Sequence, residues 1–240
     1  MPMTDPDDRL LIVTGASGGI GGATAVAFRA AGWRVVNLSR RTVAIDGVIH
    51  ITCDLATPGF VAALTPALAP HLVGTTAICL LHNAALLEND RTGELTDDAW
   101  RRILEINLVA PNALNNLVLP HLRAGSSILY VGSTLSEKAV PNSLSYVTSK
   151  HALVGMMRAT CQDLIGRGIH TALVCPGFTD TAMLREHVGD DPGVLASIAG
   201  LSAYGRLIDP TEIAATLLFA ATHPVLNGAV IHANLGQIEH

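Results

Sequence analysis

Three polar side chains in residues 128–150 have the types and the spacing of a proton-transfer site. Ser133 follows a short apolar run that is typical of a buried strand, and Tyr146 and Lys150 lie on a predicted helix after a polar loop. A tyrosine and a lysine four residues apart share one helix face, where the lysine would favour the tyrosinate. Ser133 could bond the same oxygen as Tyr146. Such a pair alone is more often part of a solvated helix surface than of a catalytic site, so the choice between the two depends on motifs elsewhere in the chain.

A glycine-rich segment, TGASGGIG, directly follows the first predicted strand at residues 9–13. A helical pattern then runs from Gly22 to about Ala31. A strand, a glycine-rich turn and a helix N-terminus form an anion cradle, because glycines let the backbone approach a pyrophosphate and unpaired N–H groups point at it. This context favours a dinucleotide site over an ordinary turn.

The second predicted strand, residues 33–38, ends in Ser39, Arg40 and Arg41. In a doubly wound nucleotide-binding fold this strand end lies beside the adenosine ribose. An acidic residue there would bind the 2′-hydroxyl of NAD, whereas arginine accommodates the 2′-phosphate of NADP, so the sequence favours NADP. The alternative is that both arginines are solvated loop charges.

The third predicted strand, residues 48–53, follows too soon after Arg41 for a full crossover helix. Asp54 comes next, where it could meet the adenine or act as the N-cap of a helix from Pro58. Later in the chain, Asn107 lies in an apolar helical stretch, and the nearby Pro111 is expected to kink or open that helix.

Two further polar turns follow predicted strands at the edge where open α/β sheets bind ligands. His82-Asn83-Ala84-Ala85 follows the strand at residues 75–81, and Pro176-Gly177 follows the strand at residues 170–175. Residues 182–205 then mix short helical pieces with glycine and aspartate, a composition that suggests a mobile flap over the site.

The composition limits the class of protein. With 240 residues, 49% hydrophobic and 15% charged, the chain suits one α/β domain with a buried parallel sheet. No apolar run reaches the roughly 18 residues that cross a bilayer, and the acidic first ten residues do not resemble a secretory signal, so we expect a cytoplasmic protein. Four scattered cysteines predict buried thiols, without a disulfide or metal site. A net charge of -5 gives no reason to expect nucleic acid.

These motifs resemble the short-chain dehydrogenase/reductase family, in its order and spacing, over nearly the whole chain. The matching residues are Thr14, Gly15, Gly19, Gly21, Asn83, Ala84, Asn107, Ser133, Tyr146, Lys150, Pro176 and Gly177. The resemblance implies one Rossmann-like domain over residues 1–240, with a doubly wound sheet of about seven parallel strands and helices on both faces. It also implies a nicotinamide dinucleotide as cofactor.

The resemblance further implies a catalytic set of Asn107, Ser133, Tyr146 and Lys150. Tyr146 would exchange the proton of the carbonyl or alcohol oxygen, and Ser133 would fix that oxygen. Lys150 would lower the pKa of the tyrosine and hold the nicotinamide ribose, and Asn107 would hold a water that links Lys150 to solvent. The residues expected at the cofactor are Thr14, Gly15, Ser17, Gly19, Ile20, Gly21, Ser39, Arg40, Arg41, Asp54, Leu55, Asn83, Ala84, Tyr146, Lys150, Pro176, Gly177, Phe178, Thr179 and Thr181.

The sequence therefore predicts an NADP-dependent oxidoreductase that interconverts a carbonyl compound and its alcohol, as a homodimer or homotetramer. The alternatives are an NAD-dependent alcohol dehydrogenase of the same fold and a non-catalytic NADP-binding regulator. The substrate is expected to be a mostly apolar small molecule. The side chains expected around it are Leu86, Leu87, Met183, Leu184, Leu195, Ile198 and Tyr204.

The chain departs from the family pattern in three segments. The connection after Arg41 is short, which weakens the inference of a 2′-phosphate pocket. Ala85 stands where the family usually has glycine, so the cofactor loop is expected to sit slightly differently. Near the C-terminus, where many members have Asp-Gly-Gly, residues 234–237 read Asn-Leu-Gly-Gln. That segment often lies at a subunit interface in the family, which weakens the expectation of a tetramer.

Overall fold

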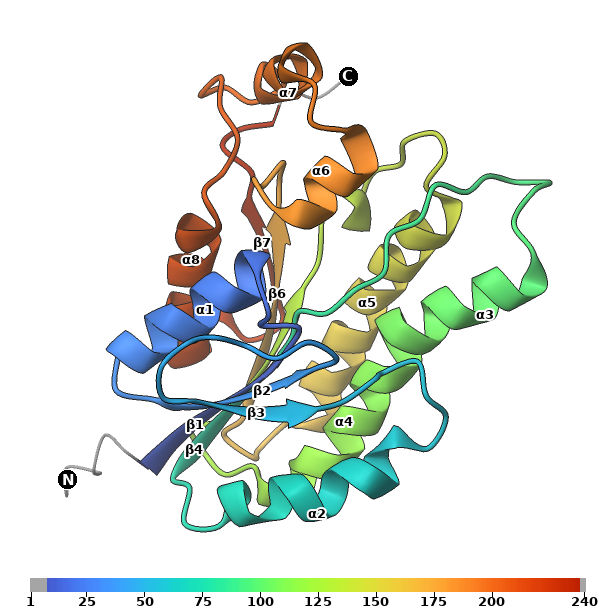
Figure 1. The fold of residues 1–240 in the computed structure, drawn as a ribbon. Helices are drawn as coiled ribbons and strands as arrows, with labels where there is room; N and C mark the ends of the chain where they lie inside the picture. The colour runs from blue at the N-terminus through green and yellow to red at the C-terminus, as the bar shows by residue number, and fades with distance from the viewer. Residues whose placement is uncertain (1–7, 238–240) are drawn as a thin grey trace.

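The computed structural model describes residues 8–237, which form a sheet between two layers of helices (Figure 1). The sheet has seven parallel strands in the order β3-β2-β1-β4-β5-β6-β7, so the direction of strand order reverses between β1 and β4. This confirms the predicted doubly wound, Rossmann-like sheet, whose ligand crevice lies at the carboxyl ends of the strands beside that reversal. The strands are β1 (Arg9–Thr14), β2 (Arg34–Ser39), β3 (Val48–Thr52), β4 (Ala77–His82), β5 (Ser127–Val131), β6 (His170–Pro176) and β7 (Ala229–Ala233).

Helices cover both faces of the sheet, and the central strands are therefore continuous apolar runs. Leu10 and Ile12 of β1 point into a core shared with α2, α4 and α5, whereas Leu11 and Val13 point into a core shared with α1 and α8. The helices are α1 (Gly19–Ala30), α2 (Phe60–Leu72), α3 (Asp97–Leu104), α4 (Ala110–Val118), α5 (Leu144–Asp163), α6 (Ala182–Val188), α7 (Pro192–Ala199) and α8 (Pro210–Thr222).

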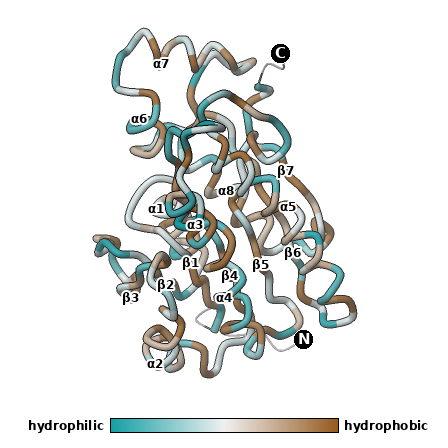
Figure 2. The backbone as a smooth tube through the Cα atoms, turned by 90° about the vertical axis from the view of Figure 1, so that its right-hand side faces the viewer, coloured by the Kyte–Doolittle hydropathy of each residue, from teal (hydrophilic) through white to brown (hydrophobic). Residues whose placement is uncertain are grey.

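The predicted flap consists of α6 and α7, which stand beyond the carboxyl ends of β6 and β7 at the top of Figure 1. Figure 2 shows them at one end of the molecule and α2 at the other. Short helical turns complete the fold, and one of them, Glu105–Val109, is a π-helix between α3 and α4. Further short turns in the described part of the chain are Leu119–His121, Thr134–Ser136 and Pro224–Leu226.

Most predicted elements exist, with ends shifted by a few residues. The first helix begins at Gly19, inside the glycine-rich turn, and not at Gly22. The connection from β2 to β3 contains no helix, as its length predicts. The alternative role of Asp54 as an N-cap is wrong, because α2 begins at Phe60 after Gly59 in a left-handed conformation, and Asp54 Oδ1 accepts from Ala56 N at 3.0 Å.

All four cysteines are buried and free, as predicted. Within residues 8–237 no group of histidine, cysteine or carboxylate side chains could hold a metal ion. None of the helices described is long and apolar enough to cross a membrane.

Candidate active site

The glycine-rich turn is shaped by close contacts that leave no room for side chains. Gly15 and Gly19 have positive φ angles of 75° and 54°, which favour glycine. A Cβ on Gly21 would lie 2.5 Å from both Asn83 Nδ2 and the Gly15 carbonyl oxygen. Gly18, by contrast, faces open space and caps α1 without a side-chain hydrogen bond. The first N–H groups of α1 are therefore available to an anion.

Two predicted cofactor residues, Thr14 and Asn83, stabilise this turn through hydrogen bonds. Thr14 Oγ1 accepts hydrogen bonds from the Asn83 and Ala84 backbone N–H groups, each at 3.0 Å. The Asn83 side chain donates to the carbonyl oxygens of Thr14 and Gly15, at 2.9 and 3.2 Å. Neither Thr14 nor Gly21 is among the residues that line the cavity described below, so their place in the structure is a supporting one.

The end of β2 is held by a polar network that the sequence did not predict. Asn37, fully buried in β2, accepts from the Ala16 N–H at 2.8 Å and donates to Ser39 Oγ at 2.8 Å. The amide of Asn37 also lies 3.0 Å from His50 Nδ1, and Ser39 Oγ donates to the Arg41 carbonyl oxygen at 2.6 Å. One buried asparagine thus couples the glycine-rich turn to the segment that carries both arginines.

Ser133, Tyr146 and Lys150 meet at the end of β5. Ser133 begins a short turn whose Leu135 N–H donates to Ser133 Oγ at 3.1 Å, and α5 carries Tyr146 and Lys150, 8% and 4% exposed. Lys150 Nζ donates to the Val131 carbonyl oxygen at 2.7 Å and lies 5.3 Å from the centre of the Tyr146 ring. The structure therefore brings these three predicted residues together.

The electrostatics of this group differ from the expectation. Burial raises the pKa of Tyr146 to about 12, and the neighbouring Ser133 hydroxyl opposes that rise. Burial also lowers the pKa of Lys150 to about 8. The predicted lowering of the Tyr146 pKa by Lys150 is thus not seen, because both groups lose hydration and the ammonium is hydrogen-bonded to Val131. Tyr146 is a protonated phenol over the ordinary pH range in this arrangement.

Asn107 lies in the π-helix, four residues before Pro111, which is in the first turn of α4. The side-chain amide of Asn107 contacts the backbone of Leu86. The Leu86 N–H donates to Asn107 Oδ1 at 2.8 Å, and the Leu86 carbonyl oxygen accepts from Asn107 Nδ2 at 3.0 Å. Nδ2 also donates to Ser149 Oγ at 3.0 Å, next to Lys150. This confirms the predicted opening of the helix, and it makes Asn107 an anchor for the segment that follows β4.

That segment is anchored a second time at Asp90. The Asp90 carboxylate accepts from the backbone N–H of Ser145 at 2.9 Å and from its hydroxyl. The Asp90 N–H donates to the Asn142 carbonyl oxygen at 3.1 Å. Asp90 therefore binds the start of α5, one residue before Tyr146, a contact that no sequence motif indicated.

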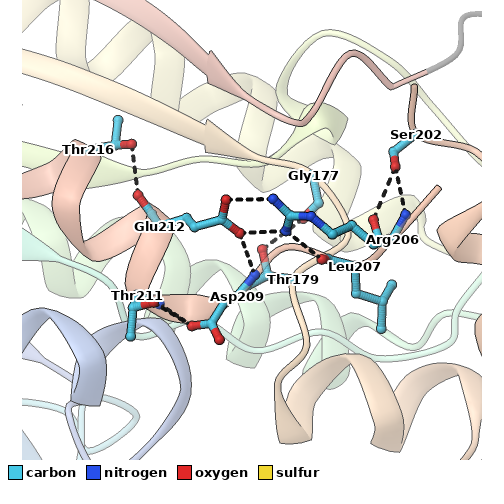
Figure 3. A network of polar contacts seen from close by, with 9 residues as sticks. All are labelled: Gly177, Thr179, Ser202, Arg206, Leu207, Asp209, Thr211, Glu212 and Thr216. Atoms are coloured by element: carbon cyan, nitrogen blue, oxygen red, sulfur yellow. Dashed lines mark hydrogen bonds and ion pairs between the residues drawn. The ribbon is translucent and has the colours of Figure 1, made fainter. Parts of the chain in front are cut away.

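The flap is fastened at both of its ends. Arg185 on α6 donates to both carboxylate oxygens of Asp180, at 2.8 and 3.0 Å. At the other end Arg206 donates to both oxygens of Glu212, at 2.7 and 2.8 Å (Figure 3). Ile208 pairs with the backbone of residues 178–180, so this second end lies beside the Pro176–Gly177 turn.

The C-terminal segment also holds the flap. Ala203 N–H donates to the carbonyl oxygens of Leu235 and Gly236, both at 3.1 Å, and Gln237 lines the cavity. The departure of residues 234–237 from the family pattern therefore reaches the wall of the site at Gln237.

One cavity of about 450 Å³ connects these parts. It reaches from Arg40 and Arg41, past the glycine-rich turn, to Ser133, Tyr146 and Lys150, and it continues under the flap. The predicted site residues among its lining are Gly15, Ser17, Gly19, Ile20, Ser39, Arg40, Arg41, Asp54, Leu55, Asn83, Ala84, Ser133, Tyr146, Lys150, Pro176, Gly177, Phe178, Thr179 and Thr181. Asn107, like Thr14 and Gly21, is not among them.

The apolar end of the cavity is only partly the one expected. Leu86, Leu87, Met183 and Leu184 line it as predicted, but Leu195, Ile198 and Tyr204 do not. Lining residues that the sequence did not single out include Leu38, Cys53, Arg102, Ile106, Val131, Gly132, Thr134, Leu135, Val140, Ser143, His187, Val188 and Gln237. They come from segments far apart in the sequence, which no local pattern joins.

The chain matches a family profile described as enoyl-(acyl carrier protein) reductase over residues 15–237. It is 30% identical to 2-keto-3-deoxy-L-fuconate dehydrogenase of Xanthomonas campestris pv. campestris over 91% of this chain and 77% of that protein. The chain belongs to the short-chain dehydrogenase/reductase family. Members are oxidoreductases that act on carbonyl and alcohol groups with a nicotinamide dinucleotide, and this chain has their fold and motifs.

Solved structures of family members are closely similar. Ligand-free aldohexose dehydrogenase AldT of Thermoplasma acidophilum has a TM-score of 0.88 and 28% identity, over 97% of this chain and 94% of that one. Angucycline C-6 ketoreductase LanV with bound NADP has a TM-score of 0.85 and 27% identity, over 97% and 96%. The two relatives act on different compounds, so the shared fold does not name a substrate.

Proposed function

We propose that this chain is an NADP-dependent oxidoreductase that interconverts a carbonyl compound and its alcohol, with Tyr146 as general acid and base. The observation that carries the proposal is the single cavity that joins the glycine-rich turn to the buried Ser133, Tyr146 and Lys150. A dinucleotide held at the first of these and a carbonyl held at the second would share one enclosed space. The NADP bound to LanV adds support.

The chain's own residues fit such a cofactor. The uncapped N-terminus of α1 and the open space at Gly18 suit a pyrophosphate, which Ser17 and the backbone of Gly19 and Ile20 would hold. Arg40 and Arg41 are exposed at the same end of the cavity, without an acidic residue at the end of β2, and they would hold a 2′-phosphate. The residues Pro176–Thr181 would hold the nicotinamide end of the cofactor.

The hydride chemistry belongs to the bound cofactor. In reduction Tyr146 donates its phenolic proton to the substrate oxygen and is then reprotonated from solvent. In oxidation Tyr146 first releases its proton, and the tyrosinate accepts the proton of the alcohol. The Ser133 hydroxyl donates to the same oxygen and holds it beside Tyr146. Lys150, whose pKa of about 8 leaves it charged at neutral pH, supplies positive charge close to the Tyr146 ring. Asn107 fixes the wall at Leu86, and its predicted role in holding a water stays a prediction.

The cofactor preference is tested by fluorescence titration of the purified protein with NADPH and with NADH. We expect tighter binding of NADPH, and we expect Arg40→Asp to reverse the preference, because it would repel the 2′-phosphate. Arg158→Asp, an exposed residue of α5 outside the cavity, makes the same change in charge and is the control. An NADPH/NADH ratio that Arg40→Asp leaves unchanged would contradict the assignment and favour the NAD-dependent alternative.

The catalytic role is tested with Tyr146→Phe on a panel of ketones and alcohols. We expect the variant to lose turnover by about 10²- to 10⁴-fold while it still binds NADPH, because the phenolic proton is removed and the ring remains. Tyr204→Phe, at an exposed tyrosine, is the matched control. Bound cofactor without turnover of any compound by the unaltered protein would favour the non-catalytic regulator.

We also propose that the chain works as a homodimer or homotetramer of single-domain subunits, with residues 1–240 forming one dinucleotide-binding domain. Membership of a family of oligomeric enzymes supports this proposal. Sedimentation velocity at micromolar protein concentration tests it, and a monomer there would contradict it.

A further inference from the structure

The part of the cavity beyond Tyr146 carries basic side chains. Arg102 of α3 and His187 of α6 line it together with the apolar residues of the flap and of the segment after β4. Among the described residues that line the cavity, Asp54 is the acidic one, and it follows β3 at the cofactor end. An anion in the substrate part would therefore meet the positive charge of Arg102, and the nearby carboxylate of Glu88 contacts Arg102 without lining the cavity.

Arg102 is placed at the rim of this part. It lies one helical turn before Ile106, which also lines the cavity, and its side chain is 56% exposed. Its contact with Glu88 brings Nη1 to 3.5 Å from Oε1. That separation is well beyond the 2.7–2.9 Å of a charge-assisted hydrogen bond, so Glu88 holds the guanidinium only loosely.

Three arginines near this part of the site, Arg101, Arg185 and Arg206, are paired more closely with carboxylates. Arg185 and Arg206 each donate two hydrogen bonds to one carboxylate, and Arg101, the neighbour of Arg102, contacts Asp97 and Asp98 at 3.1 and 3.3 Å. None of these three lines the cavity. Arg102 thus differs from these three arginines in two ways: it lines the cavity, and its guanidinium is held less closely by a carboxylate.

We propose that Arg102 binds a carboxylate of the substrate, so that the natural substrate is an oxo acid, or a hydroxy acid in the reverse direction. The inference rests on the proposed function, because it names the substrate of that same site. A guanidinium presents two parallel N–H groups that match the two oxygens of a carboxylate. The apolar lining by Leu86, Leu87 and Met183 suits an aliphatic chain between the carboxylate and the reacting carbonyl.

A phosphate monoester is the other anion that an arginine binds, and the site suits it less. A phosphate dianion offers three oxygens and is commonly held by several donors, whereas this part of the cavity presents one guanidinium and one imidazole. Binding of the carboxylate would replace the loose contact between Arg102 and Glu88 by two direct hydrogen bonds. Glu88 is accordingly a competitor for Arg102.

The test uses the full chain with NADPH and straight-chain methyl ketones that end in a carboxylate, each compared with its methyl ester and with the corresponding oxoalkyl phosphate. We expect kcat/KM for the acid to exceed that for the ester by roughly 10- to 100-fold at the best chain length, the range of a charge-assisted hydrogen-bond pair. Arg102→Gln should bring the ratio of acid to ester close to one, mainly through KM.

Two further variants sharpen the test. Arg101→Gln removes the same charge from the same helix outside the cavity and should keep the ratio. Glu88→Gln removes the competitor and should lower KM for the acid more than for the ester. Both results would support the carboxylate site.

The failures are distinguishable. Esters reduced as well as acids, or a ratio that survives Arg102→Gln, would overturn the carboxylate inference and leave the proposed function intact. A phosphate preferred to the carboxylate would overturn the choice of anion. If NADPH binds and no ketone of any series is reduced, the proposed function fails and the inference fails with it.

Discussion

Protonation of His82 should destabilise the protein, because the second proton would lie on a buried ring nitrogen that has no hydrogen-bond acceptor within residues 8–237. His82 ends β4 and is 4% exposed, and its Nε2 lies 2.8 Å from Asn115 Oδ1. The Asn115 amide donates to the Tyr130 hydroxyl at 2.9 Å, so its oxygen accepts and His82 Nε2 carries the hydrogen. Among the described residues, Nδ1 is buried without a hydrogen-bond partner. A proton there would create a buried charge.

The magnitude follows from the shift in pKa. Burial lowers the pKa of His82 from about 6.5 to about 4, and the hydrogen bond with Asn115 opposes that change. Between these values the unfolded chain binds the proton and the folded chain does not, so stability falls as the pH is lowered through this range. The full loss from this group is about 3 kcal/mol, and about 2 kcal/mol of it falls between pH 7.5 and pH 5.

The assay is urea denaturation of the unaltered protein and of His82→Gln between pH 7.5 and pH 5. A glutamine amide can still donate to Asn115, but it does not titrate, so the unaltered protein should lose about 2 kcal/mol more than the variant over this range. His121→Gln, at an exposed histidine, controls for the loss of one histidine elsewhere. A difference between the two proteins that stays constant over the whole pH range would refute the reasoning.

Three more predictions concern the site. Gly21→Ala would place a Cβ 2.5 Å from Asn83 Nδ2 and from the Gly15 carbonyl oxygen, so it should weaken NADPH binding at least about tenfold in a fluorescence titration. Gly155→Ala adds a Cβ in open space on α5 and should leave NADPH binding unchanged. Asp90→Asn should raise KM for the carbonyl compound several-fold with little change in NADPH affinity, because it loosens the substrate wall; equal losses in both would contradict this. In cofactor-free protein, the tyrosinate absorbance of Tyr146, measured against Tyr146→Phe, should be absent below pH 10, since burial raises its pKa to about 12.

The parts of the site that are local in sequence could be predicted. The glycine-rich turn lies between a strand and a helix, and Tyr146 and Lys150 lie on one helix face, so neighbouring residues alone determine these features. Strand ends at Ser39 and Pro176 could be placed in the cavity because parallel strands align their carboxyl ends at one edge.

Features that depend on long-range packing could not be predicted. The pairing of Asp90 with Ser145 joins residues 55 positions apart, and nothing local indicates it. The expected direction of the shift in the Tyr146 pKa was wrong because the side chain is buried, and burial depends on the packing of the whole fold. The alternative of an N-cap at Asp54 was wrong because α2 begins after the left-handed Gly59.

The double anchoring of the segment after β4 has a consequence for redesigning this protein. Leu86 is tied through its backbone to Asn107, and Asp90 is tied to the start of α5, so the chain between them bridges two fixed points. Residues 87–89 are therefore a short exchangeable module, and a library restricted to these three positions could retarget the enzyme while Tyr146 keeps its place. Transplants that cut the chain outside Leu86 or Asp90 would discard an anchor and shift α5, the helix that carries Tyr146.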